Sequence, residues 1–232
     1  MNKEYFGVGK RGRFKKPTLI IDVDDTLINS SEVTIDLLSE KYEFTDRIKK
    51  LDREDIYKEL KEWKYYTFFC SKDDPLRLEI SREAQNIYGS KKFWDRIYFK
   101  QGIDLMFKEF GKSYKWIINS KGTKKNLEYK REWLENNIPS WVDYELVLDI
   151  AEWGGKMDKS HLVGDIIVDD RVDVLNSNDS PVKVLLRNYR FTRYNGGFEG
   201  HRDDIINKDI YEVDNIKEVM DILRFFKDYK LE

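Results

Sequence analysis

Five aspartates stand directly after two short apolar runs of this 232-residue chain: Asp22, Asp24 and Asp25 after residues 19–21, and Asp169 and Asp170 after residues 166–168. A buried carboxylate is costly unless a cation or a metal ion offsets its desolvation. If both runs are neighbouring strands of a parallel sheet, their carboxyl ends bring the two acidic groups to one edge. Such an oxygen-rich pocket would suit Mg²⁺, which prefers carboxylates, water and a substrate phosphate. Either group alone could be only a turn or a helix cap, but the two together favour a metal site.

Three further residues could serve a phosphoryl group at the same edge. Phosphoryl transfer is catalysed mainly by positioning and by electrostatic stabilisation of the charged oxygens. Asn119 and Ser120 follow a third apolar run, residues 116–118, and offer an amide and a hydroxyl. Lys159 precedes the second acidic pair and offers a fixed cation. These residue types together predict chemistry on a phosphate ester.

Five short apolar runs are expected to form the strands that position these residues: 19–21, 116–118, 146–148, 166–168 and 182–186. Each is continuous rather than alternating, which is typical of strands buried on both faces of a parallel sheet. Residues 123–136 are expected to form a helix with Thr123 as its N-cap. An apolar stripe predicts a second helix near the C-terminus: Ile216, Val219, Met220 and Leu223. The alternation predicts an α/β fold with a Rossmann-like, doubly wound parallel sheet.

Residues 29–100 interrupt this alternation, because they show helical charge patterning and no strong strand run. We expect them to be a helical cap domain inserted after the first strand. The core domain would then comprise residues 17–28 and 101–232, with the cap over the strand ends where ligands of open α/β sheets bind. Aromatic side chains are frequent in the cap: Trp63, Tyr65, Tyr66, Phe68, Phe69, Phe93 and Trp94. The favoured interpretation is that they form the cap's own core, and the alternative is that some stack on a nucleobase.

The amino-acid composition limits the kinds of molecule that we expect the protein to bind. With 42 basic and 44 acidic residues, the formal net charge of −2 argues against a protein that holds nucleic acid by bulk charge. Residues 1–16 are the exception, with six Lys or Arg against one Glu, and we expect a flexible basic arm. The arm is either a solubilising tail or a contact to phosphate or nucleic acid. The single cysteine, Cys70, fits a reducing compartment, and no apolar run is long enough to span a membrane, so we expect a soluble, cytoplasmic protein.

The chemistry-bearing residues match a known superfamily in type, order and spacing. Asp22-Val-Asp-Asp-Thr26 resembles the DxDxT signature of the haloacid dehalogenase-like superfamily. Ile118-Asn-Ser120, Lys159 and Val168-Asp-Asp170 resemble its second, third and fourth motifs. The resemblance implies a Mg²⁺-dependent phosphomonoester hydrolase that works through an aspartyl-phosphate.

The resemblance also implies a role for each matching residue. Asp22 is the nucleophile, and Asp24 is the general acid that protonates the leaving oxygen and later activates water. The implied ligands of Mg²⁺ are Asp22, the backbone carbonyl of Asp24, and one or both of Asp169 and Asp170. The implied phosphate-binding residues are Ser120, Asn119 and Lys159, of which Lys159 neutralises the developing charge.

The segment 158–171 resembles the 5′(3′)-deoxyribonucleotidases more narrowly. It implies a nucleoside monophosphate substrate, with deoxyribonucleotides favoured, and Arg171 as a further substrate-binding residue. The Asp-Asp-Arg run also occurs in the phosphatase half of phage polynucleotide kinases, so a nucleic-acid 3′ end or a sugar phosphate remains an alternative substrate. A nucleotide-binding module without catalysis is the alternative from another class. Four residues are secondary: Lys156 as a substitute for Lys159, Tyr194 and Asn195 for shaping the site, and His161 as a structural residue.

Overall fold

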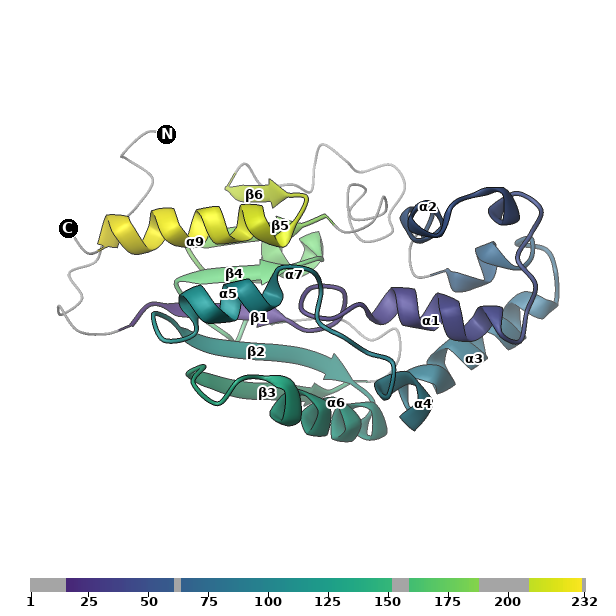
Figure 1. Ribbon diagram of the computed structural model, residues 1–232, viewed down its shortest axis with the longest axis horizontal. Coiled ribbons are helices and arrows are strands. Elements are labelled where there is room, and N and C mark those ends of the chain that lie inside the picture. Colours follow the sequence, from purple (N-terminus) through teal and green to yellow (C-terminus); the bar gives the residue numbers. More distant parts are fainter. Residues whose placement is uncertain (1–15, 61–63, 152–158, 188–208, 231–232) are drawn as a thin grey trace.

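A computed structural model of the protein describes residues 16–60, 64–151, 159–187 and 209–230. Within them, six parallel strands form one sheet in the order β3-β2-β1-β4-β5-β6 (Figure 1). The strands are β1 (Thr18–Asp22), β2 (Lys115–Gly122), β3 (Tyr144–Ile150), β4 (Ile166–Asp169), β5 (Val182–Leu186) and β6 (Ile210–Val213). The first five contain the five apolar runs of the sequence. β1 lies in the middle of the sheet, between β2 and β4.

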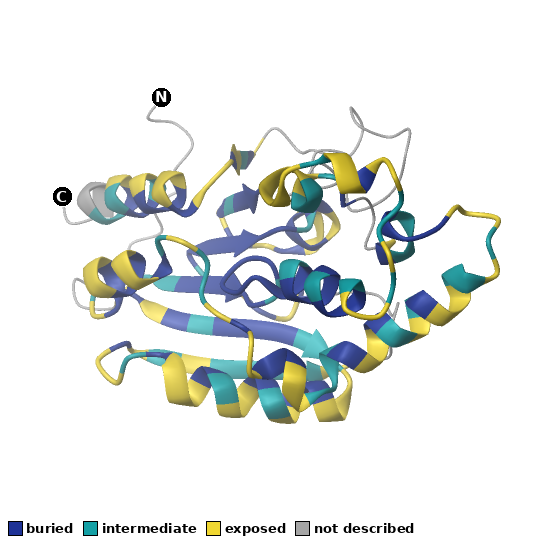
Figure 2. Ribbon diagram, turned by 45° about the vertical axis from the view of Figure 1, so that its right-hand side comes forward, coloured by how far each residue is buried: buried dark blue, intermediate teal, exposed yellow. Residues whose placement is uncertain are grey.

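Both faces of the sheet are covered, which explains why its central strands are apolar throughout (Figure 2). On β1, Leu19 and Ile21 belong to one hydrophobic cluster, and Ile20 belongs to a second one on the opposite face. The first cluster includes side chains of α5 (Ile103–Phe110), α6 (Lys124–Asn137) and α9 (Ile216–Lys230). The second includes side chains of α7 (Val172–Ser177). The expected α/β fold with a doubly wound parallel sheet is confirmed.

Two helices form where the sequence predicted them. Thr123 is the N-cap of α6, and its Oγ1 accepts a hydrogen bond from the backbone N–H of Asn126 at 3.5 Å. The four residues of the C-terminal stripe are buried on one side of α9. Three elements were not anticipated: the short helices α5 and α7 and the edge strand β6. β6 is only four residues long, and two of them are not buried, so it carries almost no periodic signal.

The insertion after β1 consists of helices and turns. Its elements are α1 (Ser30–Ser39), the 3₁₀ turns η2 (Ile48–Lys50) and η3 (Tyr65–Phe68), α2 (Arg53–Lys58), α3 (Leu76–Tyr88) and α4 (Lys91–Trp94). In Figure 1 it extends beyond the carboxyl ends of the strands. Of the seven aromatic residues named from the sequence, five are buried in the hydrophobic core: Tyr65, Phe68, Phe69, Phe93 and Trp94. These rings are therefore used for packing in the hydrophobic core. Trp63 lies outside the described residues.

The two chain segments that join the insertion to the sheet lie side by side. Residues 27–29 lead into it and residues 98–100 lead out of it. Three hydrogen bonds connect them: Lys100 N to Leu27 O at 2.8 Å, Asn29 N to Tyr98 O at 3.4 Å, and Tyr98 N to Asn29 Oδ1 at 3.0 Å. The insertion therefore enters and leaves the core at a single place, directly after the loop that carries the first three aspartates.

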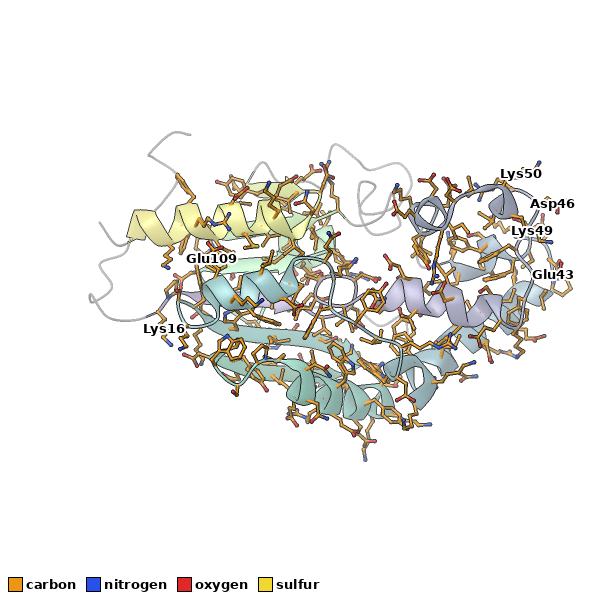
Figure 3. All side chains as sticks on the ribbon, viewed as in Figure 1. Lys16, Glu43, Asp46, Lys49, Lys50 and Glu109 are labelled. Atoms are coloured by element: carbon orange, nitrogen blue, oxygen red, sulfur yellow. The ribbon has the colours of Figure 1, made fainter. Side chains whose placement is uncertain are left out.

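Charged surface residues at the two ends of the molecule lie far from the carboxyl ends of the strands (Figure 3). At the tip of the insertion, Glu43 is 90% exposed at its side chain and pairs with Lys49 at 3.1 Å. At the other end, Lys16 Nζ donates to Asp143 Oδ2 at 2.8 Å, and the other fifteen residues of the basic arm lie outside the described residues. Exposed pairs of this kind contribute about 0–1 kcal/mol each. None of the described helices has the length and apolar character needed to cross a membrane.

Candidate active site

The carboxyl ends of β1, β2 and β4 bring the predicted residues to one edge of the sheet. β1 and β4 pair with Ile21 beside Val168, so Asp22 and Asp169 follow on adjacent strands. On its other side Asp22 is in register with Asn119 of β2. The two acidic groups therefore meet as the sequence predicted, and the polar end of β2 lies next to them.

Lys159 lies between the two acidic groups. Its Nζ donates to Asp22 Oδ1 and to Asp169 Oδ2, the latter at 2.7 Å, and its side chain is 1% exposed. The backbone at this point is fixed by Asn178, whose Nδ2 donates to Lys159 O at 3.0 Å and to Leu162 O at 2.7 Å. We call Asp22, Lys159, Asp169 and the adjacent Asp170 the Lys159 centre.

The Lys159 centre has more negative than positive groups. Burial raises the pKa of Asp22 to about 7; the ammonium of Lys159 opposes this, and the nearby carboxylates add to it. The pKa of Asp170 is also raised well above its ordinary value, first by burial and then by Asp169 and Asp22. Burial alone would lower the pKa of Lys159, but Asp169 and Asp22 outweigh it and raise that pKa. Three carboxyl groups against one ammonium make an environment that favours a second cation.

One buried oxygen indicates where such a cation would fit. Asp170 Oδ2 is buried and has no hydrogen-bond partner within the described residues. In that same part of the chain, no three His, Cys, Asp or Glu side chains form a group that could hold a metal by themselves. Mg²⁺ commonly takes only one or two carboxylates and completes its shell with waters and substrate phosphate. The donor set therefore fits Mg²⁺ bound together with a phosphate.

A second buried lysine, Lys130, binds Asp24, and the sequence analysis did not predict it. Lys130 of α6 donates from Nζ to Asp24 Oδ2 and to Ser120 Oγ, the latter at 2.7 Å, and its side chain is 0% exposed. Ser120 Oγ also donates to Asp24 Oδ2 at 3.1 Å. We call Asp24, Lys130 and Ser120 the Lys130 centre. Its signal in the sequence was a lysine in line with Leu127 and Leu134, on the apolar face of a helix.

Asn119 and Arg171 are placed differently from the other predicted residues. The Asn119 amide nitrogen donates to Val147 O at 2.9 Å, so it ties β2 to β3. The guanidinium of Arg171 donates to both carboxylate oxygens of Asp173, at 3.0 and 2.6 Å. The backbone N–H of Arg171 donates to Asp169 Oδ1 at 2.9 Å and so helps to orient that carboxylate. The guanidinium also opposes the rise in the pKa of Asp170, so Arg171 contributes to the site through its charge as well as its main chain.

Of the four secondary candidates, the structure describes His161 alone. Lys156, Tyr194 and Asn195 lie outside the described residues. His161 is half exposed, and its Nε2 lies 3.4 Å from Asp149 Oδ2. Cys70 is a buried free thiol.

The arrangement of sheet and insertion is shared with solved structures. A haloacid dehalogenase-like family hydrolase from Streptococcus pneumoniae matches with a TM-score of 0.50 and 15% identity, over 91% of this chain and 98% of that one. Protein Tyrosine Kinase A from Mycobacterium tuberculosis matches with a TM-score of 0.52 and 14% identity, over 90% and 99% of the two chains. The chain has the haloacid dehalogenase-like fold.

Sequence comparisons add no closer relative, since no family model matches the chain and no curated protein does either. The haloacid dehalogenase-like fold is therefore established by structure, and it agrees with the fold that the motif resemblance implied. At this level of identity the likeness carries the fold alone. What the site does must follow from its own residues.

Proposed function

We propose that this protein is a Mg²⁺-dependent phosphomonoester hydrolase in which Asp22 is the nucleophile and Asp24 the general acid and base. One observation carries the proposal. Asp22 is the last residue of β1 and Asp24 lies two residues later, yet each carboxylate is bound by a different buried ammonium, Lys159 or Lys130. Two like groups held in two different environments are what a nucleophile and a proton donor require.

The reaction proceeds in two displacements. In the first, a carboxylate oxygen of Asp22 attacks phosphorus, the ester P–O bond breaks, and the carboxyl group of Asp24 gives its proton to the leaving alkoxide. In the second, Asp24 takes a proton from a water molecule that attacks the aspartyl-phosphate. The bond between phosphorus and Asp22 breaks, inorganic phosphate leaves, and both aspartates return to their starting states.

The surrounding residues stabilise charge on the phosphoryl oxygens. Lys159 and Ser120 supply an ammonium and a hydroxyl from opposite sides of Asp22, and Lys130 supplies a second ammonium beside Ser120. Asp22, the backbone carbonyl of Asp24, and Asp169 or Asp170 would hold the magnesium ion. When bound, the ion neutralises the repulsion between an anionic nucleophile and an anionic phosphate.

For the substrate we propose a nucleoside monophosphate, with deoxyribonucleotides favoured. The support is the resemblance of residues 158–171 to the 5′(3′)-deoxyribonucleotidases. A nucleic-acid 3′ end or a sugar phosphate is the second candidate, and the basic charge of residues 1–16 favours a polymer. Both candidates use the same chemistry at Asp22.

Phosphate release tests the proposal directly. The wild-type protein is assayed with deoxyribonucleoside and ribonucleoside monophosphates, sugar phosphates and a 3′-phosphorylated oligonucleotide, each with Mg²⁺ and with EDTA. We expect Mg²⁺-dependent turnover of the monophosphates and its complete loss in Asp22→Asn. Turnover of the oligonucleotide alone would replace the proposed substrate. No turnover of any ester by the wild type would leave only a nucleotide-binding module.

A further inference from the structure

A chain of hydroxyl groups runs from the loop after β1 into the insertion. Ser31 Oγ donates to Asp25 Oδ2, the Tyr65 hydroxyl lies 3.0 Å from Ser31 Oγ, and the Tyr88 hydroxyl lies 2.9 Å from that of Tyr65. Ser31 is on α1, Tyr65 on η3 and Tyr88 at the end of α3. Ser31 and Tyr65 are buried, and the reaction proposed above uses none of these residues.

The direction of the hydrogen bonds is fixed along this chain. Each hydroxyl has one proton to donate. Because Ser31 gives its proton to Asp25, it must accept from Tyr65, and Tyr65 must in turn accept from Tyr88. Hydrogen bonds that all point the same way polarise one another, so loss of one member weakens its neighbours.

The inner end of the chain holds the turn that aims Asp24. Asp25 has a φ of 57°, a left-handed conformation that is uncommon for residues other than glycine. Its carboxylate accepts from Ser31 N at 2.8 Å and from Ser30 Oγ at 3.1 Å, and its own N–H donates to Ser30 Oγ at 3.0 Å. These bonds keep the turn in place, and Asp24 is the adjacent residue. Movement of Asp25 would therefore move the carboxylate of Asp24 away from Ser120.

The outer end of the chain reaches Asp24 by a second, independent route. Asn126 Nδ2 of α6 donates to Tyr88 O at 2.8 Å. One turn further along α6, Lys130 binds Asp24. Gly122, at the end of β2, allows the Asn126 side chain to lie close to that strand, because a Cβ at residue 122 would collide with it. Tyr88 is thus connected to Asp24 through Asp25 on one side and through α6 on the other.

We propose that Tyr65 and Tyr88 are positioning residues, through which the placement of the insertion controls the general acid Asp24. The inference rests on the proposed function, since it assigns these residues to proton delivery in that reaction. Neither tyrosine touches the phosphate. Their hydroxyls hold the carboxyl group of Asp24 where it can protonate the leaving oxygen.

Tyr65→Phe is the decisive variant, because it keeps the buried ring and removes only the hydroxyl in the middle of the chain. Its kcat/KM is measured for an alkyl phosphate, whose leaving group needs a proton, and for p-nitrophenyl phosphate, whose leaving group needs little help. We expect a loss of about tenfold for the alkyl ester and less than about threefold for the aryl ester, because general acid catalysis is worth about 10²–10⁴-fold and the acid is displaced rather than removed. A structural defect would lower both values equally.

Two further variants should show the same effect at different sizes, and a third variant is the matched control. Tyr88→Phe removes the outermost hydroxyl and should show the same preference at smaller size, while Ser31→Ala removes a bond to Asp25 itself and should show the largest. Tyr42→Phe also removes one tyrosine hydroxyl of the insertion, which donates to Glu79 at 2.8 Å, and should leave the ratio of the two substrates unchanged.

The two possible failures are distinguishable. If the wild type hydrolyses both esters but Tyr65→Phe keeps the wild-type ratio of alkyl to aryl kcat/KM, the positioning role is wrong and the proposed function stands. If the wild type hydrolyses neither ester nor any nucleotide, the proposed function itself fails. Thermal unfolding of each variant confirms that a folded protein is assayed.

Discussion

The two buried lysines of the site differ in what surrounds them. The Lys159 centre draws its carboxylates from two strands, and Asp22 and Asp169 are at most 8% exposed at their side chains. The Lys130 centre has one carboxylate, Asp24, whose side chain is 27% exposed, and one hydroxyl. The first centre has excess negative charge and is closed to solvent, whereas the second is balanced and partly open.

In the proposed reaction, this difference would place nucleophilic attack and proton transfer at two different centres. Excess buried negative charge favours a metal ion and, through it, the anionic substrate, so the Lys159 centre is suited to nucleophilic attack. A carboxylate that exchanges protons with a leaving group and with water has to be reachable, and Asp24 is. Asp22 and Asp24 could therefore take the two proposed roles although they are only two residues apart, because different elements supply their counter-ions.

The largest expected effect comes from Lys159→Met, which keeps an unbranched side chain and removes the cation. It leaves Asp22 and Asp169 buried without their shared counter-ion, at a cost of about 3–5 kcal/mol in the free energy of unfolding of the metal-free protein. Loss of one electrostatic stabiliser should lower kcat by about 10²–10³-fold. Urea unfolding and steady-state kinetics measure the two quantities. An unchanged kcat would contradict the role of Lys159.

Lys130→Met is the matched substitution at the other centre and should be milder. Because Asp24 keeps contact with water, we expect a cost of about 1–3 kcal/mol in the free energy of unfolding. The kcat/KM for alkyl phosphates should fall by about 10–100-fold, with a smaller loss for p-nitrophenyl phosphate. Equal losses in Lys130→Met and Lys159→Met, for stability and for both substrates, would remove the distinction between the centres.

Magnesium should stabilise the protein in a pH-dependent way that belongs to the Lys159 centre. The folded protein raises the pKa of Asp22 from 3.8 to about 7, so below 3.8 its contribution to stability is fully present. That contribution is lost as the pH rises through about 7, because the carboxylate is then charged and buried. Mg²⁺ binds the charged form, so it should raise Tm more at about pH 8 than at about pH 5.

Calorimetric or fluorescence melts with Mg²⁺ and with EDTA measure this shift. Lys130→Met should keep the pH dependence of the magnesium effect, whereas Asp170→Asn should weaken the effect at the higher pH. If Mg²⁺ raised Tm equally at both pH values, metal binding would not depend on the protonation state of Asp22.

The smallest expected effects come from the residues that support each lysine from outside. Asn178→Ala removes three hydrogen bonds, two to the backbone near Lys159 and one from Ser180 N, and should lower the free energy of unfolding by about 2 kcal/mol. Thr123→Ala removes the N-cap of α6, which carries Lys130, and should cost about 1 kcal/mol. Urea unfolding gives both values. If Thr123→Ala lowers the free energy of unfolding more than Asn178→Ala does, the Lys130 centre is the more rigid of the two, which is the opposite of what we expect.

The sequence predicted the strand-borne part of the site well and the helix-borne part poorly. Asp22 and Asp169 were found because a charged residue after a continuous apolar run is a local signal, and parallel pairing then brings such residues together. Lys130 lies in a helix with many charged residues, where the side that faces inward depends on how α6 packs against β2. The turn at Asp25 and the hydroxyl chain were also missed, since Ser31, Tyr65 and Tyr88 are far apart in the sequence.

The central place of β1 has a consequence for biosynthesis. Among the described strands β1 is synthesised first, but its neighbours begin only at Lys115 and Ile166. Because non-local pairing must wait for these later strands, Asp22 stays in water until β2 and β4 have been made. The nascent protein therefore passes through a long stage in which the helical insertion has been synthesised and Asp22 has no sheet to hold it. During synthesis, the edge of the sheet that carries the candidate site takes shape only after β4 has been made.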